Sequence, residues 1–378
     1  MTASKVYFAD LRTPYGGETM PARLVRLAKT AGIEKIDMNG KFVAIKIHFG
    51  ELGNVSYIRP NYIRGIVDLV KQLGGKPFLV DCNTMYPGFR KNAVEHIECA
   101  WMNGFTPYTV DCPIIIGDGL KGTDDVAVKV EGCEYTKEAL IGRAVMDADV
   151  IISISHFKGH EDAGFGGALK NIGMGCGSRA GKKDMHSHGK PVIDPNVCRG
   201  CRGCQKECAN NGLKFDEATK KMTVNLDNCV GCGRCLGACN FDAISFGESN
   251  AVSILDAKIA EYTKAVLDGR DNFHMNLIID VSPYCDCHSE NDAPILPNIG
   301  MFASFDPVAL DQACADACLA ATPLPNTKIT DNQSKADFVD HHDHFKNSNP
   351  ESEWKFQLSH GEKIGLGTRE YELIKITK

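Results

Sequence analysis

The sequence predicts an α/β protein with a mainly parallel sheet, interrupted by a smaller cysteine-rich domain. Short apolar segments typical of buried strands alternate with segments of helical periodicity through the first half of the chain. This alternation stops after residue 155. The chain becomes dense in cysteine near residue 191, and the alternation resumes near residue 248. We therefore expect residues 1–190 and 248–378 to form one α/β domain and residues 191–247 to form an insert.

The elements of the first half follow from apolar spacing and from residues that begin or end helices. Pro60 begins a helix whose apolar side includes Ile63, Ile66 and Val70, and the pair Gly74-Gly75 ends it. We predict strands over residues 6–9, 42–48, 76–81 and 149–155. We predict the other helices over residues 22–30, 94–103 and 137–146.

The segment 156–191 is rich in glycine and predicts a long loop. It directly follows a predicted strand, and ligands bind at the carboxyl ends of strands in open α/β sheets. This segment begins with His156, Lys158 and His160, and a second group follows: Asp162, Lys170 and Asn171. A metal or an anionic substrate would suit such a cluster. The alternative is a solvated loop with structural glycines. The glycine spacing does not match the G-x-G-x-x-G fingerprint, so we exclude nicotinamide binding.

The α/β pattern of the second half predicts a helix over 252–267, a strand over 274–281 and a helix over 307–320. Asp306 is the expected N-cap of the last helix, because Pro307 fits its first turn. Residues 331–350 are polar and predict a solvated stretch, in which His341, His342 and His344 lie on the surface. A metal site is the alternative for these histidines. A short strand over 372–377 ends the pattern.

Composition limits the class of protein. The net charge of −6 argues against a partner that is nucleic acid or an anionic membrane, and no apolar run is long enough to span a bilayer. No secretory signal is visible at the N-terminus, so we expect a cytoplasmic protein. Seventeen cysteines in a reducing compartment favour metal ligation over disulfides, and their odd number cannot pair completely within the chain.

Two cysteine runs share the spacing C-x2-C-x2-C-x3-C. In this pattern three thiolates bind one cubane and the fourth reaches across to the second. The expected ligands of one [4Fe–4S] cluster are Cys198, Cys201, Cys204 and Cys239; those of the other are Cys229, Cys232, Cys235 and Cys208. Gly200 lets the backbone wind closely around the cluster. Zinc or disulfides are the alternative at these eight positions.

The insert resembles a bacterial two-cluster ferredoxin, an α+β module with short strands near residues 213–215 and 243–246. It departs from that family at Ala209 and Asn240, where proline usually follows the fourth cysteine. This departure bears on the local geometry and the reduction potential, and not on the ligation.

Two further clusters follow predicted strands. Lys46 and His48 lie on one side of a strand end, where a functional site and the edge of the core are equal alternatives. Cys285, Cys287 and His288 are candidates for a third metal or iron–sulfur centre, with buried or free thiols as the alternative. Two more cysteines, four residues apart on one helix, are expected in the core: Cys314 and Cys318.

The chain resembles the family catalogued as domain of unknown function 362, in the branch described as iron–sulfur centre proteins. The matching stretches are KIHFGE at 46–51, SHFKGH and GFGGALKNIGMGC within 155–176, the insert, CDCH at 285–288 and FASFDPVALDQA at 302–313. The resemblance implies an α/β domain similar to the lactate racemase fold, and a redox role without an agreed substrate. The catalytic lysine and histidines of that racemase have no one-to-one match here, so we do not carry over its nickel cofactor.

We expect an iron–sulfur electron-transfer protein or oxidoreductase component from an anaerobe. Electrons from a redox partner protein would pass through the two clusters to a site in the α/β domain or to a partner enzyme. We expect the substrate cavity to be lined by His48, His156, Lys158 and His160. The alternative is an activator or maturation factor that supplies electrons or a cluster to another enzyme and has no turnover of its own. A homo-oligomer is compatible with either function.

Overall fold

The computed structural model describes residues 3–86, 88–186, 190–229, 231, 235, 238–239, 241, 243–246 and 251–376. Its centre is an eight-stranded sheet. In sheet order the strands are β16 (Tyr371–Lys375), β1 (Ser4–Asp10), β15 (Gly300–Ser304), β14 (Asp271–Ile278), β7 (Val150–His156), β2 (Phe42–Lys46), β3 (Lys76–Asp81) and β4 (Ile114–Ile116). β15 pairs antiparallel with β14 and β1, and the other pairings are parallel. The predicted α/β class with a mainly parallel sheet is confirmed.

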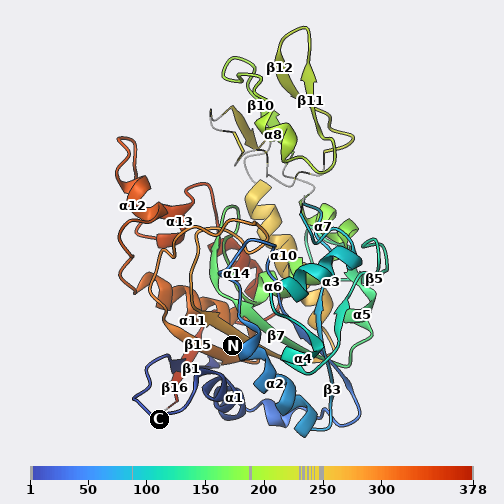
Figure 1. Cartoon of the computed structure of the whole chain (residues 1–378), viewed down its shortest axis with the longest axis vertical. Helices are drawn as coiled ribbons and strands as arrows, with labels where there is room; N and C mark the ends of the chain where they lie inside the picture. The colour runs from blue at the N-terminus through green and yellow to red at the C-terminus, as the bar shows by residue number, and fades with distance from the viewer. Residues whose placement is uncertain are drawn as a thin grey trace.

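Helices cover both faces of the sheet (Figure 1). Along β2, Val43 and Ile45 belong to the apolar cluster of one face, whereas Ala44 belongs to the cluster of the other, as the two-residue period of a strand requires. The main helices are α1 (Met20–Ala31), α2 (Pro60–Gln72), α3 (Ala93–Met102), α6 (Ala168–Cys176), α10 (Ala251–Leu267), α11 (Pro307–Leu319) and α14 (Lys355–Lys363). Asp306 caps α11 as predicted, because its Oδ1 accepts the N–H groups of Val308 and Ala309, each at 2.9 Å. None of the described helices has the length and apolar character needed to cross a membrane.

The helix predicted over residues 137–146 is wrong. Most of this segment is β6 (Glu138–Gly142), which forms a hairpin with β5 (Asp125–Lys129), and only the short α5 (Arg143–Met146) is helical. Ala139 and Ile141 alternate inward and join the apolar cluster that includes residues of α10. Burial of these alternate side chains in a paired strand outweighs the helix propensity of the sequence.

The long loop predicted over 156–191 is also wrong. The segment contains β8 (Lys158–His160), β9 (Gly164–Gly166), α6 and α7 (Arg179–Met185). Helix α6 packs tightly on α10, because a Cβ at Gly173 would lie only 2.1 Å from the carbonyl oxygen of Ile259. Gly173 interrupts the apolar periodicity of a helix in the sequence, and the same residue permits the close contact between α6 and α10.

The polar stretch 331–350 is more ordered than the sequence suggests. It contains the end of α12 (Lys328–Gln333) and the whole of α13 (His344–Ser348). Phe345 is fully buried against the aromatic ring of Phe165, and the Nε1–H of Trp354 donates to Asp343 Oδ2 at 2.7 Å. The prediction of a solvated stretch is wrong for these residues, although His341 and His342 are exposed.

The cysteine-rich segment lies at one end of the molecule, beyond α7 and α10 (Figure 1). Its start, β10 (Pro191–Ile193), pairs antiparallel with its end, β13 (Ile244–Phe246), so the chain leaves and re-enters the α/β part through adjacent strands. A second hairpin joins β11 (Leu213–Asp216) to β12 (Lys221–Val224), and α8 (Gly203–Lys206) precedes it. The strands predicted at 213–215 and 243–246 are present. The domain boundaries themselves stay a prediction.

Buried His274 should make the fold sensitive to acid. Its ring lies between Ser153 Oγ, 2.8 Å from Nδ1, and Asn272 Oδ1, 2.9 Å from Nε2. Burial lowers the pKa of His274 to about 3, whereas histidine in an unfolded chain titrates near ~6.5. The unfolded chain therefore binds a proton that the folded chain excludes, and stability is lost as the pH falls below about 6.5.

We expect His274 to account for a loss of about 2 kcal/mol between pH 6.5 and pH 5, from 1.4 kcal/mol per pH unit. Urea unfolding of His274→Gln at both pH values should show a smaller decrease than the wild type. His342→Gln, at an exposed position, is the matched control and should keep the wild-type pH dependence. Equal decreases for His274→Gln and the wild type would exclude His274 as the source.

Candidate functional site

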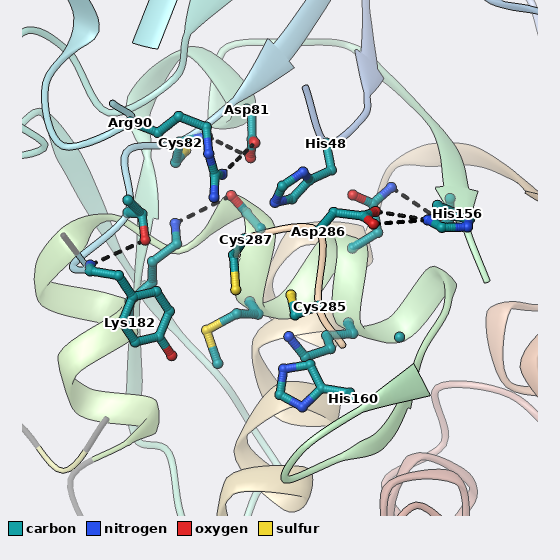
Figure 2. Close-up of a pocket in the computed structure, with 18 of the residues that line it drawn as sticks. His48, Asp81, Cys82, Arg90, His156, His160, Lys182, Cys285, Asp286 and Cys287 are labelled. Carbon is teal, nitrogen blue, oxygen red and sulfur yellow. Dashed lines mark hydrogen bonds and ion pairs between the residues drawn. The ribbon is translucent and has the colours of Figure 1, made fainter. Parts of the chain in front are cut away.

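A pocket of about 740 Å³ opens at the carboxyl ends of three parallel strands (Figure 2). Lys46 is the last residue of β2, Asp81 of β3 and His156 of β7, and all three line the pocket. Because parallel strands end at the same edge of the sheet, their terminal side chains converge there. The pocket therefore lies where the sequence predicts a ligand site.

All the residues predicted to line a substrate cavity reach this pocket: His48, His156, Lys158 and His160. Cys285 and Cys287 line it as well, on the loop that follows β14. The structure thus brings together residues from three separate stretches of sequence. Their catalytic roles stay predictions.

His156 has no free ring nitrogen. Its Nδ1 lies 2.9 Å from Asp286 Oδ2 and its Nε2 lies 2.7 Å from the carbonyl oxygen of Ile279. Both partners are acceptors, so the ring serves as a double donor and has no lone pair for a metal or a substrate proton. His156 therefore positions Asp286, and through it the loop that carries Cys285 and Cys287.

His48 and His160 present their Nε2 atoms instead. His48 Nδ1 accepts the N–H of Gly50 at 2.9 Å, so the neutral ring carries its proton on Nε2, which points into the pocket (Figure 2). Burial, followed by the positive charge of Arg90, lowers the pKa of His48 to about 3. His160 Nδ1 accepts the N–H of Asp162 at 3.1 Å, which leaves its Nε2–H to donate to the thiol of Cys285. Both histidines therefore direct an Nε2–H group away from their own backbone contacts.

The two thiols of the loop form a hydrogen-bonded pair. The hydrogen bond with Cys287 lowers the pKa of Cys285, burial opposes this, and the ammonium groups of Lys158 and Lys170 lower the pKa further. The lowered pKa favours the thiolate form of Cys285, which is the form that acts as a nucleophile or a metal ligand.

His288 does not join this thiol pair at the pocket wall. Its Nε2 lies 3.0 Å from Glu161 Oε1 and its Nδ1 lies 3.6 Å from Glu290 Oε1. Within the described parts of the chain, no three His, Cys, Asp or Glu side chains are grouped as ligands of one metal ion. A third metal centre at Cys285, Cys287 and His288 stays a prediction.

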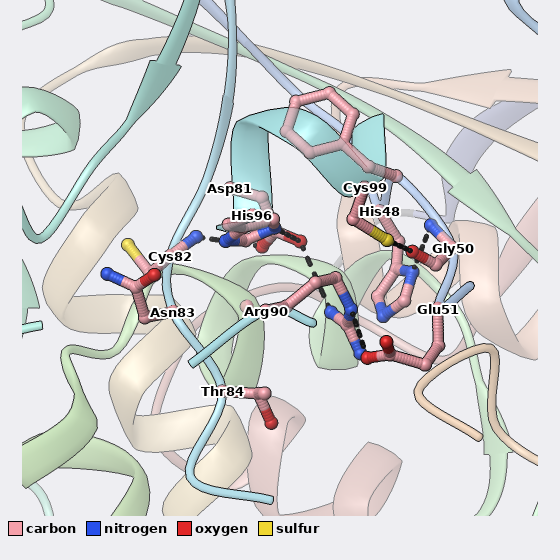
Figure 3. Close-up of polar contacts among 12 residues, drawn as sticks. His48, Gly50, Glu51, Asp81, Cys82, Asn83, Thr84, Arg90, His96 and Cys99 are labelled. Carbon is pink, nitrogen blue, oxygen red and sulfur yellow. Dashed lines mark hydrogen bonds and ion pairs between the residues drawn. The ribbon is translucent and has the colours of Figure 1, made fainter. Parts of the chain in front are cut away.

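A buried polar network supports the wall of the pocket (Figure 3). Arg90 Nε lies 3.0 Å from Glu51 Oε2, and Arg90 Nη1 lies 3.8 Å from Asp81 Oδ2. Lys46 Nζ lies 3.1 Å from Asp81 Oδ1 and donates to Asn171 Oδ1 at 2.8 Å. Burial raises the pKa of Asp81, but the positive charge of Lys46 and the neighbouring histidines and Arg90 outweigh it, so the pKa falls below its usual range. These pairs hold β2, β3 and α6 in place.

Of the residues predicted to follow His160 in the cluster, Lys170 and Asn171 line the pocket, whereas Asp162 does not. Sequence reasoning missed four residues of the pocket: Asp81, Arg90, Lys182 and His186. Lys170 and Asn171 lie on α6 and Lys182 lies on α7, in the segment predicted to be a loop. Without those helices no face could be assigned to them. A signal existed for Asp81, because a carboxylate that ends an apolar strand in an α/β sheet lies at the ligand-binding edge.

A second cavity lies inside the insert. Its empty space is about 300 Å³, and its wall includes four cysteines: Cys198, Cys201, Cys204 and Cys239. Burial, and then the nearness of the other three thiols, raise the pKa of Cys204 to about 11. Three thiols of the first run and the last thiol of the second run therefore surround one space.

Backbone N–H groups point at the cysteine sulfurs. Gly200 and Met222 each donate to Cys198 Sγ at 3.4 Å, and Gly212 donates to Cys208 Sγ at 3.1 Å. Gly200 has φ +65°, and a Cβ there would lie 2.1 Å from the carbonyl oxygen of Lys220, so only glycine fits. Of the second predicted ligand set, Cys232 lies outside the described residues.

The fold and these two cavities define an α/β protein with a polar pocket at the strand ends and a cysteine-rich insert. The chain belongs to the family described as Domain of unknown function (DUF362), whose model matches residues 43–316.

Comparison with solved structures finds distant likenesses. The lactate racemase apoprotein from Thermoanaerobacterium thermosaccharolyticum is 13% identical with a TM-score of 0.37, over 73% of this chain and 51% of that chain. A protein from Thermotoga maritima is 10% identical with a TM-score of 0.38, over 79% of this chain and 57% of that chain. This chain thus spans little more than half the length of either structure. No functionally curated protein matches the sequence.

Proposed function

We propose that this chain is an iron–sulfur electron-transfer protein or oxidoreductase component. The insert would carry two [4Fe–4S] clusters and supply electrons to the pocket at the strand ends, with a redox partner protein as the donor. The observation that carries the proposal is the cavity shared by Cys198, Cys201, Cys204 and Cys239. A ligand set that combines three cysteines of one run with the fourth of the other is typical of two-cluster ferredoxins.

The residues fit such a cluster in donor chemistry. Thiolates are the usual ligands of [4Fe–4S] clusters, and N–H groups directed at their sulfurs help to set the reduction potential. Cys198 and Cys208 both accept such N–H groups. The other cluster would be held by Cys208, Cys229, Cys232 and Cys235. When bound, such clusters supply one-electron transfer at low potential.

The short connection between the two cavities supports electron supply within one chain. His186 lines the pocket and Ile193 lines the cysteine cavity, and they are seven positions apart in the chain. Their Cα atoms therefore lie at most about 25 Å apart, even for a fully extended chain. A protein that only activates another enzyme needs no such lined pocket beside its clusters, so the pocket favours the oxidoreductase role.

Anaerobic purification with iron and sulfide analysis tests the proposal. We expect about eight irons and eight sulfides per chain, and an electron paramagnetic resonance signal after reduction with dithionite. Cys201→Ala, at an exposed position, should lower the iron content to about half. Cys133→Ala, at a half-buried position outside the insert, is the control and should keep all the iron. Zinc in place of iron, or equal iron in both variants, would overturn the proposal.

A further inference from the structure

Three lysines on the pocket wall have no carboxylate partner within the described residues: Lys158, Lys170 and Lys182. Lys182 Nζ donates to the carbonyl oxygen of Gly177 at 2.5 Å, whereas Lys158 and Lys170 make no hydrogen bond to the described part of the protein. Lys158 is 5% exposed. Negative groups of the protein, Cys285 and Asp286 first, act on Lys158 from nearby and outweigh the effect of its burial. What marks the three ammonium groups is therefore the lack of a direct ion pair, which leaves them available to an anion in the pocket.

Lys158 and Lys170 also lie beside each other. A Cβ at Gly166 would be 2.9 Å from Lys158 Nζ and 3.4 Å from Lys170 Cδ, so both side chains pass over this glycine into the pocket. Two like charges repel each other in a partly buried site, where the effective dielectric constant is low. An anion between the two ammonium groups would convert this repulsion into attraction.

The other charges on the wall are compensated within the protein. The pairs are Lys46 with Asp81 at 3.1 Å, Arg90 with Glu51 at 3.0 Å, and His156 with Asp286 at 2.9 Å. None of these pairs includes Lys158, Lys170 or Lys182.

Acidic groups near the three lysines compensate their charge only in part. The negative charges of Cys285, Asp286 and Glu161 act on Lys158, and that of Asp162 acts on Lys170. Within the described residues, however, no carboxylate forms an ion pair with either ammonium group. An anion in the pocket would therefore be the direct partner of both.

We propose that the pocket binds a small organic acid, whose carboxylate lies between the ammonium groups of Lys158 and Lys170. The Nε2–H of His48 is a further donor for its oxygens. Met85 and Met174 add apolar wall, which suits a carbon skeleton better than an inorganic ion. This inference rests on the proposed function in one respect: it takes the pocket to be the site that receives electrons from the clusters.

Thermal unfolding of the full chain with added anions tests this site. The probes are sodium succinate, sodium phosphate and sodium chloride at matched ionic strength. We expect succinate to raise the Tm of the wild type by a few degrees, in a concentration-dependent way, because it binds only the folded state. Lys158→Met and Lys170→Met should abolish the rise. Lys183→Met is the matched control, because Lys183 is exposed on the same helix as Lys182, and it should keep the rise.

Each outcome decides the proposal. A rise with succinate that only the two pocket variants lose supports it. A rise with phosphate alone, or no rise beyond that of chloride, overturns the assignment of a carboxylate, as does an equal rise in the wild type and in Lys170→Met. Lys170 is half-exposed, so its variant serves if Lys158→Met does not fold. The unfolding measurement uses no electron donor. An iron analysis that finds no clusters would therefore overturn the proposed function without affecting the conclusion on anion binding.

Discussion

Replacing Cys204 and Cys239 together by alanine should remove one cluster and leave the other, whereas replacing Cys204 and Cys208 should remove both. Cys239 lies on the same cavity as Cys204, although 35 residues separate them in sequence. In the crossed arrangement the first pair of changes affects one ligand set, and the second pair affects both. We expect about four irons per chain in the first double variant and almost none in the second.

The two double variants are matched controls for each other, since each removes two thiols and each keeps the remaining six cysteines of the runs. Iron and sulfide analysis under anaerobic conditions measures the difference. The reverse result, with the iron retained in the Cys204 and Cys208 variant, would mean that each run binds its own cluster. In that case the position of Cys239 beside the three cysteines of the first run would need an explanation other than shared ligation of a cluster.

The parts of the fold that the sequence predicted well are those with local causes. The helix that begins at Pro60 and the strand over 76–81 were predicted with correct boundaries, because proline and a continuous apolar run mark them. The position of the pocket was predicted for a similar reason. His48, His156 and Cys285 all follow predicted strands, and strand ends meet at one edge of a parallel sheet.

The parts that could not be predicted depend on contacts between distant segments. Gly173 is typical of a loop until Ile259 of α10 is known to lie against it, and so α6, the helix that carries Lys170 and Asn171, was missed. Arg90 lies in an irregular segment, and nothing local shows that it will be buried between Glu51 and Asp81. Partners of this kind come from three separate parts of the chain, and periodicity within one segment carries no information about them.

Arg90→Met should lower the free energy of unfolding by about 3–5 kcal/mol, because it leaves the carboxylate of Glu51 buried without its cation. The side chains of Arg90 and Glu51 are each 3% exposed, and their Nε–Oε2 distance is 3.0 Å. Arg64→Met is the matched control. Arg64 forms an exposed pair with Asp68 at the same distance, and its loss should leave the stability nearly unchanged.

The double variant Arg90→Met with Glu51→Gln separates two explanations for the loss. If the cost comes from an unpaired buried carboxylate, removing that charge should restore most of the stability. If the guanidinium mainly fixes the position of β2 against β3 through Asp81, the double variant should stay as unstable as Arg90→Met. Urea unfolding distinguishes the two, and a loss in Arg90→Met as small as in Arg64→Met would contradict both. Because Arg90 also lines the pocket, restored stability together with a lost succinate response would show that the ion pair shapes the pocket wall as well as stabilising the fold.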